Sequence, residues 1–327
     1  MHQNRPMASV LIATGERATP PDLTGAPPGL DVRVAAGEDA LEFFPDAEAL
    51  IFWQNDPEFL RRNWSLLHRV RWVHVTSAGV EKILFPALRD SEVVLTNSQG
   101  VFDRSIAEHI LAETLAHLQK VRLAWNNQRQ RVWQKYETEI IGGRHAVIYG
   151  TGAIGRETAR LFRAVGFEVS GVGRTARSDD PDFGPVWAYT ELAEAASVAD
   201  VLAICCPLTE ETRGSVDASV LSRIKEGALV INIARGPVIV SDDLIAALDS
   251  GRVSGASLDV FDIEPLPEDS PLWDHPKVAI TPHIAGDDTQ WKRRANEVML
   301  EQLRRWERGE PLLNVVDKAL GFVPSGR

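Results

Sequence analysis

The sequence predicts an α/β protein that contains two doubly wound parallel-sheet domains. Short apolar runs alternate with helical segments along the chain, a pattern typical of parallel strands covered on both faces. The chain has 327 residues, more than the roughly 250–300 residues at which a single hydrophobic core stops growing. The apolar run 145–149 leads directly into Gly150, Gly152 and Gly155 and then into a helix-forming segment. Together these observations predict two α/β domains, the second organised around a strand, a glycine turn and a helix.

Five apolar strands are predicted in the first domain, at residues 9–13, 31–35, 49–53, 70–75 and 92–96. Ligands of open parallel sheets bind beyond the carboxyl ends of the strands. The turn of Ser77, Ala78 and Gly79 follows the fourth strand and is therefore a candidate binding segment. An ordinary surface turn explains the same residues.

A helix is predicted from residue 105 to 121, because apolar residues recur there at helical spacing. Ser105 and Glu108 have the spacing of a capping box, which predicts the helix start. The polar segment 125–140, with aromatic residues between its polar ones, is expected to form an exposed arm. That arm fits either contact with a partner subunit or a solvated loop.

Further apolar strands are predicted in the second domain, at residues 167–172, 198–206, 228–234, 253–260 and 278–282. Helices are expected between them, among them 156–165, ended by Gly166, and a helix capped by Ser241. A final helix at 287–306 is expected to return to the first domain. The predicted domains are therefore 1–100 with 287–327, and 101–286.

Composition places the chain among ordinary globular proteins, with 44% apolar and 25% charged residues. The net charge of −11 argues against a nucleic-acid partner, which would require a basic surface. Cys205 and Cys206 are the only cysteines, so there is no disulfide framework and a reducing cytoplasm is expected. The N-terminal apolar stretch is too short for a signal sequence or a membrane span. No membrane partner and no metal ion are expected.

The glycine pattern is typical of a turn that binds a dinucleotide. One glycine permits the tight turn, one lets the backbone approach a pyrophosphate, and one lets the helix pack close to the strand. The free N–H groups at the helix start then face the phosphates. Gly150, Gly152 and Gly155 fit these roles, with Ala153 and Ile154 in the first helical turn.

Several longer stretches resemble one enzyme family in order and spacing: TGAIGRETARLF, CPLTEETRG, INIARGPVIVSDDLIAALDSG, SLDVFDIEPLP and LWDHPKVAITPHIAG. They resemble the D-2-hydroxyacid dehydrogenases, within the branch of glyoxylate and hydroxypyruvate reductases. The resemblance implies a flavodoxin-like substrate domain and a Rossmann NAD(P)-binding domain. It also implies reduction of a small 2-keto acid to the D-2-hydroxy acid by hydride transfer.

Arg235, Glu264 and His283 are the candidate catalytic residues. A 2-keto acid reductase requires a cation for the carboxylate and an acid that protonates the new alkoxide. Arg235 and His283 each follow a predicted strand, at the end where ligands bind. The resemblance implies that Arg235 binds the substrate carboxylate and carbonyl. It pairs His283, as general acid and base, with Glu264.

The end of the strand after the glycine helix predicts which cofactor is used. NAD-binding proteins place an acidic residue there, which accepts a hydrogen bond from the ribose 2′-OH. Here Gly173 stands at that position and Arg174, Thr175 and Arg177 follow, which suits a 2′-phosphate. NADP(H) is therefore the expected cofactor, with NAD(H) possible. A basic surface loop without this role is the alternative.

The resemblance implies further cofactor contacts at Cys206, Pro207, Thr212, Ile233, Ala234, Arg235, Asp259, His283, Ala285 and Gly286. Asp259 is matched to a contact with the nicotinamide amide, although a strand-end cap would also explain it. Trp53 and Trp291 are candidates for the walls of the substrate pocket, beside Ser77, Ala78, Gly79 and Arg235. Burial in the core explains either tryptophan equally well.

Two other classes of protein share these features. Formate and phosphite dehydrogenases have the same fold and much of the glycine domain. Dinucleotide-sensing transcriptional corepressors resemble the family without acting as enzymes, but the acidic charge of this chain and its lack of basic extensions disfavour that class. The resemblance also implies a homodimer joined through the cofactor domain.

Overall fold

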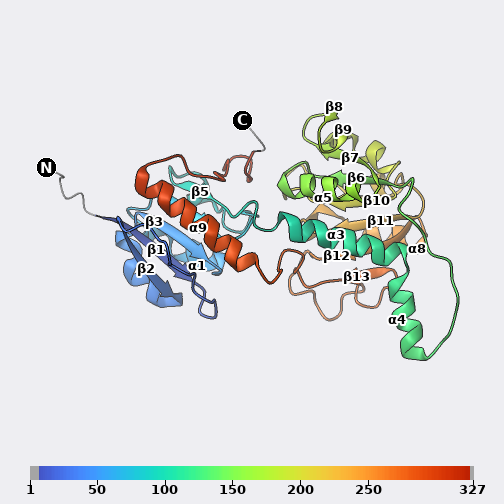
Figure 1. Cartoon of the computed structure of the whole chain (residues 1–327), viewed down its shortest axis with the longest axis horizontal. Coiled ribbons are helices and arrows are strands. Elements are labelled where there is room, and N and C mark those ends of the chain that lie inside the picture. The colour runs from blue at the N-terminus through green and yellow to red at the C-terminus, as the bar shows by residue number, and fades with distance from the viewer. Residues whose placement is uncertain (1–6, 325–327) are drawn as a thin grey trace. The chain divides into compact units, whose positions relative to one another are not determined.

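The computed structural model describes residues 7–324 and divides into two compact units. One contains the chain through Phe102 together with the residues from Thr289 onward, and the other contains Asp103–Asp288. Each unit has its own sheet, and both sheets consist mainly of parallel strands (Figure 1). The predicted fold class is confirmed.

The sheet of the first unit has five parallel strands in the order β2-β1-β3-β4-β5, a flavodoxin-like order. Its strands are β1 (Ala8–Thr14), β2 (Leu30–Ala36), β3 (Ala49–Trp53), β4 (Trp72–Val75) and β5 (Val94–Thr96). Its helices are η1 (Gly37–Asp46), α1 (Pro57–Asn63), η2 (Trp64–Leu66), α2 (Pro86–Arg89) and α9 (Trp291–Arg308).

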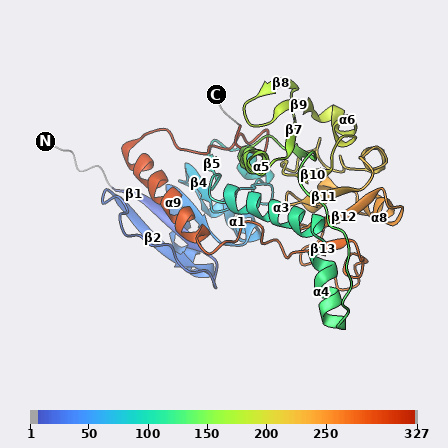
Figure 2. The ribbon, with the colours of Figure 1, turned by 45° about the vertical axis from the view of Figure 1, so that its right-hand side comes forward.

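Alternate residues of β1 show how this sheet is covered on both faces. Val10 and Ile12 belong to a buried cluster that includes Met299 and Leu303 of α9. The intervening residue Leu11 faces the opposite cluster, which is built from η1 and α1. Figures 1 and 2 both show α9 lying along the strands. The final helix is therefore part of the first unit.

The sheet of the second unit has eight strands in the order β13-β12-β11-β10-β6-β7-β9-β8. They are β6 (His145–Tyr149), β7 (Glu168–Gly173), β8 (Arg177–Asp180), β9 (Gly184–Ala188), β10 (Val201–Ile204), β11 (Ala228–Asn232), β12 (Val253–Leu258) and β13 (Val278–Ile280). Its helices are α3 (Asp103–Leu118), α4 (Val121–Gln130), α5 (Ala153–Ala164), η3 (Tyr189–Glu191), α6 (Leu192–Ala196), α7 (Ala218–Leu221), η4 (Gly236–Val238) and α8 (Ser241–Asp249). Only β8 runs antiparallel to its neighbour.

Strand β7, which follows β6 in the chain, lies on one side of β6 in the sheet, and β10 lies on its other side. This reversal creates a crevice at the carboxyl end of β6, where ligands of doubly wound sheets bind. The glycine turn begins at that end.

Two predicted helix caps are wrong, because both serines lie within the helix that they were expected to cap. Helix α3 begins at Asp103, and the Ser105 hydroxyl donates to the carbonyl of Gly286 at 3.3 Å. Ser241 is the first residue of α8, and its hydroxyl donates to the carboxylate of Asp262 at 3.3 Å. Neither serine is therefore at the N-cap position of its helix, and each hydroxyl donates to a tertiary acceptor instead.

The predicted arm starts within helix α4 and continues as irregular chain. Its indole side chains are unusually exposed, Trp125 by 64% and Trp133 by 96%. Over residues 7–324, no helix combines the length and apolar character needed to cross a membrane.

Candidate active site

The three glycines of the turn differ in the space around them. Gly150 has φ +122°, and a Cβ atom there would lie 2.6 Å from backbone atoms of Cys205 and Cys206. At Gly155 a Cβ would lie 1.9 Å from the Gly150 carbonyl oxygen, so only glycine lets α5 start this close to the turn. Gly152 is exposed, and a Cβ there would meet nothing within 4 Å.

This arrangement suits a pyrophosphate. Gly152 is the N-cap of α5, and the first N–H groups of a helix have no acceptor within the helix. The open space lies at Gly152, where those N–H groups and the positive end of the helix dipole are accessible to an anion. The residues present therefore fit a dinucleotide cofactor.

Arg235 follows β11 and precedes η4, and a buried asparagine holds its backbone. The Asn232 side chain is 1% exposed; its amide donates to the carbonyl of Arg235 at 3.0 Å and its oxygen accepts from the Ala234 N–H at 3.0 Å. Sequence reasoning missed Asn232, although a polar residue ending an otherwise apolar strand was a signal. Asn232 thereby fixes the point from which the Arg235 guanidinium extends.

Glu264 and His283 lie in contact. Oε2 of Glu264 is 3.0 Å from Nδ1 of His283, and Oε1 accepts from the Phe261 N–H at 3.1 Å. The side chains remain partly exposed, by 23% for Glu264 and 45% for His283. Because the carboxylate occupies Nδ1, Nε2 is the imidazole nitrogen available to a ligand.

His283 has a left-handed backbone, with φ +56°, which is uncommon for a residue with a side chain. Asp259 stabilises the segment around it. This carboxylate is 2% exposed and accepts from the Thr281 hydroxyl at 2.5 Å and from the N–H groups of Ile284 and Ala285 at 2.9 and 3.0 Å. Its two oxygens thus hold the residues on both sides of His283, and its contact with a nicotinamide stays a prediction.

Arg235 and Glu264 are linked through the backbone. A Cβ on Gly236 would lie 2.0 Å from the Phe261 carbonyl carbon and 2.3 Å from the Asp262 nitrogen. The turn that carries Arg235 therefore abuts the loop that carries Glu264, with no room for a side chain between them.

Other predicted cofactor residues lie on neighbouring loops. Pro207 and Thr212 belong to one loop, closed by the Thr212 hydroxyl, which donates to the Pro207 carbonyl at 2.7 Å. Cys206, Ile233, Ala234 and Ala285 are buried, which leaves their backbone groups as the means of contact. Burial raises the pKa of the Cys206 thiol, so it stays protonated.

Arg174 and Thr175 are exposed in the turn between β7 and β8. Arg177 starts β8, and its guanidinium lies 3.1 Å from the Asp180 carboxylate. Asp180 also accepts two hydrogen bonds from Arg156 of α5, at 2.9 and 3.0 Å. Burial raises the pKa of Asp180, but the bonds from Arg156 and the backbone outweigh it and lower the pKa to about 2. This ion-pair cluster ties the β8–β9 hairpin to the helix of the glycine turn.

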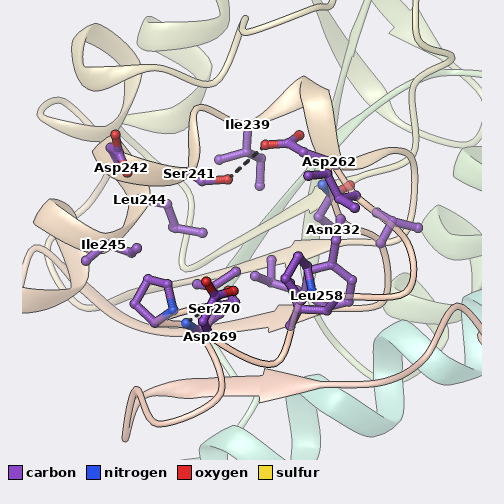
Figure 3. Close-up of a pocket in the computed structure, with 18 residues that line it drawn as sticks. Asn232, Ile239, Ser241, Asp242, Leu244, Ile245, Leu258, Asp262, Asp269 and Ser270 are labelled. Carbon is purple, nitrogen blue, oxygen red and sulfur yellow. Dashed lines mark hydrogen bonds between the residues drawn. The ribbon is translucent and has the colours of Figure 1, made fainter.

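A cavity of about 360 Å³ adjoins these loops without including the three catalytic candidates. Figure 3 shows apolar side chains of α8 and β12, such as Leu244 and Leu258, facing it. Asp262 lies at its edge, hydrogen-bonded to Ser241. The cavity lies beside the Glu264 loop and is distinct from the glycine turn.

In the first unit, the turn after β4 is tightly held. The Ser77 hydroxyl donates to the Gly79 carbonyl at 2.7 Å, and the Asn97 amide donates to the Ala78 carbonyl at 2.5 Å. Within the described part of the chain, no hydrogen bond is formed by the N–H groups of Ala78 and Gly79. Sequence reasoning also missed Asn97, whose signal was its position directly after a strand.

The two tryptophans predicted at the substrate pocket lie in different surroundings. Trp53 is 1% exposed in the core, and its indole N–H donates to the Thr19 carbonyl at 3.0 Å. This placement favours the core role, and its contact with substrate stays a prediction. Trp291 is only partly buried at the start of α9, with its ring 5.7 Å from that of Phe102.

Three comparisons relate the chain to known proteins. Glyoxylate/hydroxypyruvate reductase A of Salmonella typhi is 31% identical over 282 residues, which cover 84% of this chain and 88% of that protein. A D-isomer specific 2-hydroxyacid dehydrogenase from Xanthobacter autotrophicus Py2, solved with NADPH and MES, has a TM-score of 0.82 and 29% identity, covering 96% of this chain and 100% of that one. The NADPH-dependent glyoxylate/hydroxypyruvate reductase of Sinorhizobium meliloti, solved with NADP and sulfate, has a TM-score of 0.81 and 28% identity with the same coverage.

Residues 111–285 match the family model described as D-isomer specific 2-hydroxyacid dehydrogenase, NAD binding domain. The matched segment includes the glycine turn, Arg235, Glu264 and His283, and it spans more than half of the chain. The predicted resemblance is confirmed. The chain belongs to the D-isomer specific 2-hydroxyacid dehydrogenase family.

Proposed function

We propose that this protein reduces a small 2-keto acid to the D-2-hydroxy acid with NADPH. The observation that carries the proposal is the Glu264–His283 pair, 3.0 Å apart, in the same unit as the glycine turn and Arg235. A paired histidine can both donate and accept a proton, as interconversion of a ketone and an alcohol requires. Relatives named glyoxylate/hydroxypyruvate reductase support glyoxylate or hydroxypyruvate as the substrate.

Each residue then has a defined role. The planar Arg235 guanidinium binds the substrate carboxylate and polarises the carbonyl. Protonated His283 donates a proton from Nε2 to the developing alkoxide, and Glu264, bound at Nδ1, stabilises the positive charge of the imidazole before that transfer. Bound NADPH supplies the hydride. In the first unit, the N–H groups of Ala78 and Gly79 are a second candidate contact for the carboxylate.

The cofactor preference rests on the strand end after the glycine helix. Gly173 offers no carboxylate to a ribose 2′-OH, and Arg174 and Thr175 are exposed in the adjoining turn. Solved relatives in complex with NADP or NADPH support the same cofactor. Arg177 is a further candidate contact for the 2′-phosphate, and it also forms an ion pair with Asp180.

The test is a panel of glyoxylate, hydroxypyruvate and pyruvate, each with NADPH and with NADH, followed by nicotinamide absorbance and chiral analysis of the product. We expect kcat/KM with NADPH to exceed that with NADH by about tenfold or more, a difference of about 1.4 kcal/mol in transition-state stabilisation. Preference for NADH would overturn the cofactor assignment. Oxidation of formate or phosphite with NADP+, without turnover of any 2-keto acid, would favour the rival dehydrogenases.

We also propose a homodimer joined through the unit of residues 103–288. The exposed indole rings of Trp125 and Trp133 support it, because large apolar groups at a surface favour association. Multi-angle light scattering should give twice the mass of the chain, and Trp133→Ala should weaken the dimer. A wild-type monomer at micromolar concentration would contradict the proposal.

A further inference from the structure

Strand β7 has a face with almost no side chains at the end nearest the cofactor turn. Gly171 and Gly173 are two residues apart and therefore point to the same face of the strand. Neither has a positive φ, so the backbone itself would accept other residues at both positions. The restriction to glycine must come from what lies over this face.

Thr151, the residue between the first two glycines of the turn, covers that face. A Cβ built on Gly173 would lie 2.8 Å from Oγ1 and 3.2 Å from Cγ2 of Thr151. A Cβ on Gly171 would lie 3.1 Å from the same Cγ2 and 3.0 Å from the ring of Phe183. Both branches of the threonine therefore fill the space that side chains of β7 would need.

This contact cannot be relieved easily. Threonine is branched at Cβ, and its restricted χ1 leaves few rotamers that would clear the strand. Phe183 is fully buried, and the Arg156 guanidinium lies 5.4 Å from its ring centroid. Arg156 is itself bonded to Asp180, so Phe183 packs against a guanidinium that is held in place.

Gly173 is also the position where NAD-binding proteins carry the carboxylate that accepts a hydrogen bond from the ribose 2′-OH. We propose that Thr151 is a specificity-determining residue: by filling the space beside Gly173, it prevents residue 173 from carrying that carboxylate and so keeps the site without the group that favours NAD(H). This inference rests on the proposed preference for NADP(H). It adds a steric cause to the charge of Arg174, and it makes residues 151 and 173 a matched pair.

The first test measures the dissociation constants of NAD+ and NADP+ by calorimetry for four proteins: wild type, Gly173→Asp, Thr151→Ala and the double variant. Without Oγ1 and Cγ2, the closest remaining atom of residue 151 is its Cβ, at an ordinary contact distance of 3.6 Å. With Thr151 present, we expect Gly173→Asp to raise the affinity for NAD+ by less than about threefold. In the Thr151→Ala background we expect a gain of about tenfold or more, because the new carboxylate can then form a charged hydrogen bond with the ribose. An equal gain in both backgrounds, or no gain in either, would overturn the proposal.

The second test needs no cofactor and applies even if Gly173→Asp fails to fold. Gly173→Ala should lower Tm by about 2–10 °C beside Thr151, because an added methyl overpacks the contact. In the Thr151→Ala background most of that loss should disappear. The matched control is Gly142→Ala, where a Cβ would meet only one side-chain atom, at 3.9 Å. Its effect on Tm should be the same with Thr151 and in the Thr151→Ala background. An equal Tm loss from Gly173→Ala in both backgrounds would refute the steric role.

The two proposals fail in different ways. A wild-type protein that binds NAD+ more tightly than NADP+ contradicts the proposed cofactor. That result does not affect the Tm comparison of the variants at residues 151 and 173, which still measures the contact between them. If instead the substitutions at residue 173 have the same effects with Thr151 and with Thr151→Ala, only the role of Thr151 is overturned.

Discussion

His283 is the side chain on which the proposed proton transfer depends. Its Nδ1 is occupied by Glu264 at 3.0 Å, and Asp259 accepts from the Thr281 hydroxyl before it and from the Ile284 N–H after it. His283→Ala should lower kcat by about 10²–10⁴, the usual contribution of a general acid. Steady-state kinetics with the best 2-keto acid measure this, and a kcat within threefold of wild type would remove His283 from the mechanism.

Glu264→Gln removes the negative charge beside His283 and leaves the size of the side chain almost unchanged. Glutamine has nearly the same size but cannot stabilise a protonated imidazole by charge, so we expect kcat to fall by about 10–100-fold, part of the contribution of the pair. Glu268→Gln is the matched control, because it makes the same change at an exposed position of the same loop and should stay within twofold. Equal activities of the two variants would contradict the pairing.

At the scale of elements, the close approach of η4 to the loop after β12 connects the two catalytic segments. A side chain at Gly236 would meet backbone atoms of Phe261 and Asp262, which cannot rotate away. Either the turn of Arg235 or the loop of Glu264 must then move. Small displacements of positioned groups reduce rates strongly.

Gly236→Ala should therefore reduce both activity and stability. We expect kcat/KM to fall by about 10²-fold and the free energy of unfolding by about 1–3 kcal/mol, the typical effect of overpacking. Kinetics and urea unfolding measure the two quantities, with Gly142→Ala as the control for the change of residue type. Normal kinetics in a folded Gly236→Ala protein would show that the two loops are not coupled.

For the molecule as a whole, buried His74 makes stability depend on pH. His74 is 0% exposed in β4, with Nδ1 2.9 Å from the Thr96 hydroxyl, and burial lowers its pKa to about 3. The unfolded chain binds a proton at about 6.5, whereas the folded chain does not until about 3. The free energy of unfolding therefore falls as pH decreases below about 6.5, by up to about 1.4 kcal/mol per pH unit.

His74→Gln should remove this part of the slope. Urea unfolding of the wild type and the variant between about pH 5 and 7 measures the slope that His74 causes. Asp180, with a pKa of about 2, is charged in this range in both the folded and the unfolded chain. Other buried histidines contribute equally to both proteins and cancel in the difference. Identical slopes would mean that His74 does not remain neutral in the folded state.

Much of the fold and part of the candidate site could be predicted from local patterns. Apolar strands, glycine turns and the positions of Arg235 and His283 after strands depend on residues adjacent in sequence. The helix caps at Ser105 and Ser241 were wrong because both residues lie within their helices, and their hydroxyls donate to Gly286 and Asp262, which are distant in sequence. The supporting roles of Asn232 and Asp259 also required the structure, since a hydrogen-bond partner is known only once the chain has folded.

The sequence by itself determined the α/β class, the glycine turn and the residue types available for catalysis, because strand and turn preferences act over a few neighbouring residues. Only the tertiary structure decided the order of strands around β6, the 3.0 Å contact between Glu264 and Nδ1 of His283, and the contact of Thr151 with Gly171 and Gly173. These features bring together segments that are separated along the chain. Their distances depend on how strands and helices pack, which no local pattern specifies.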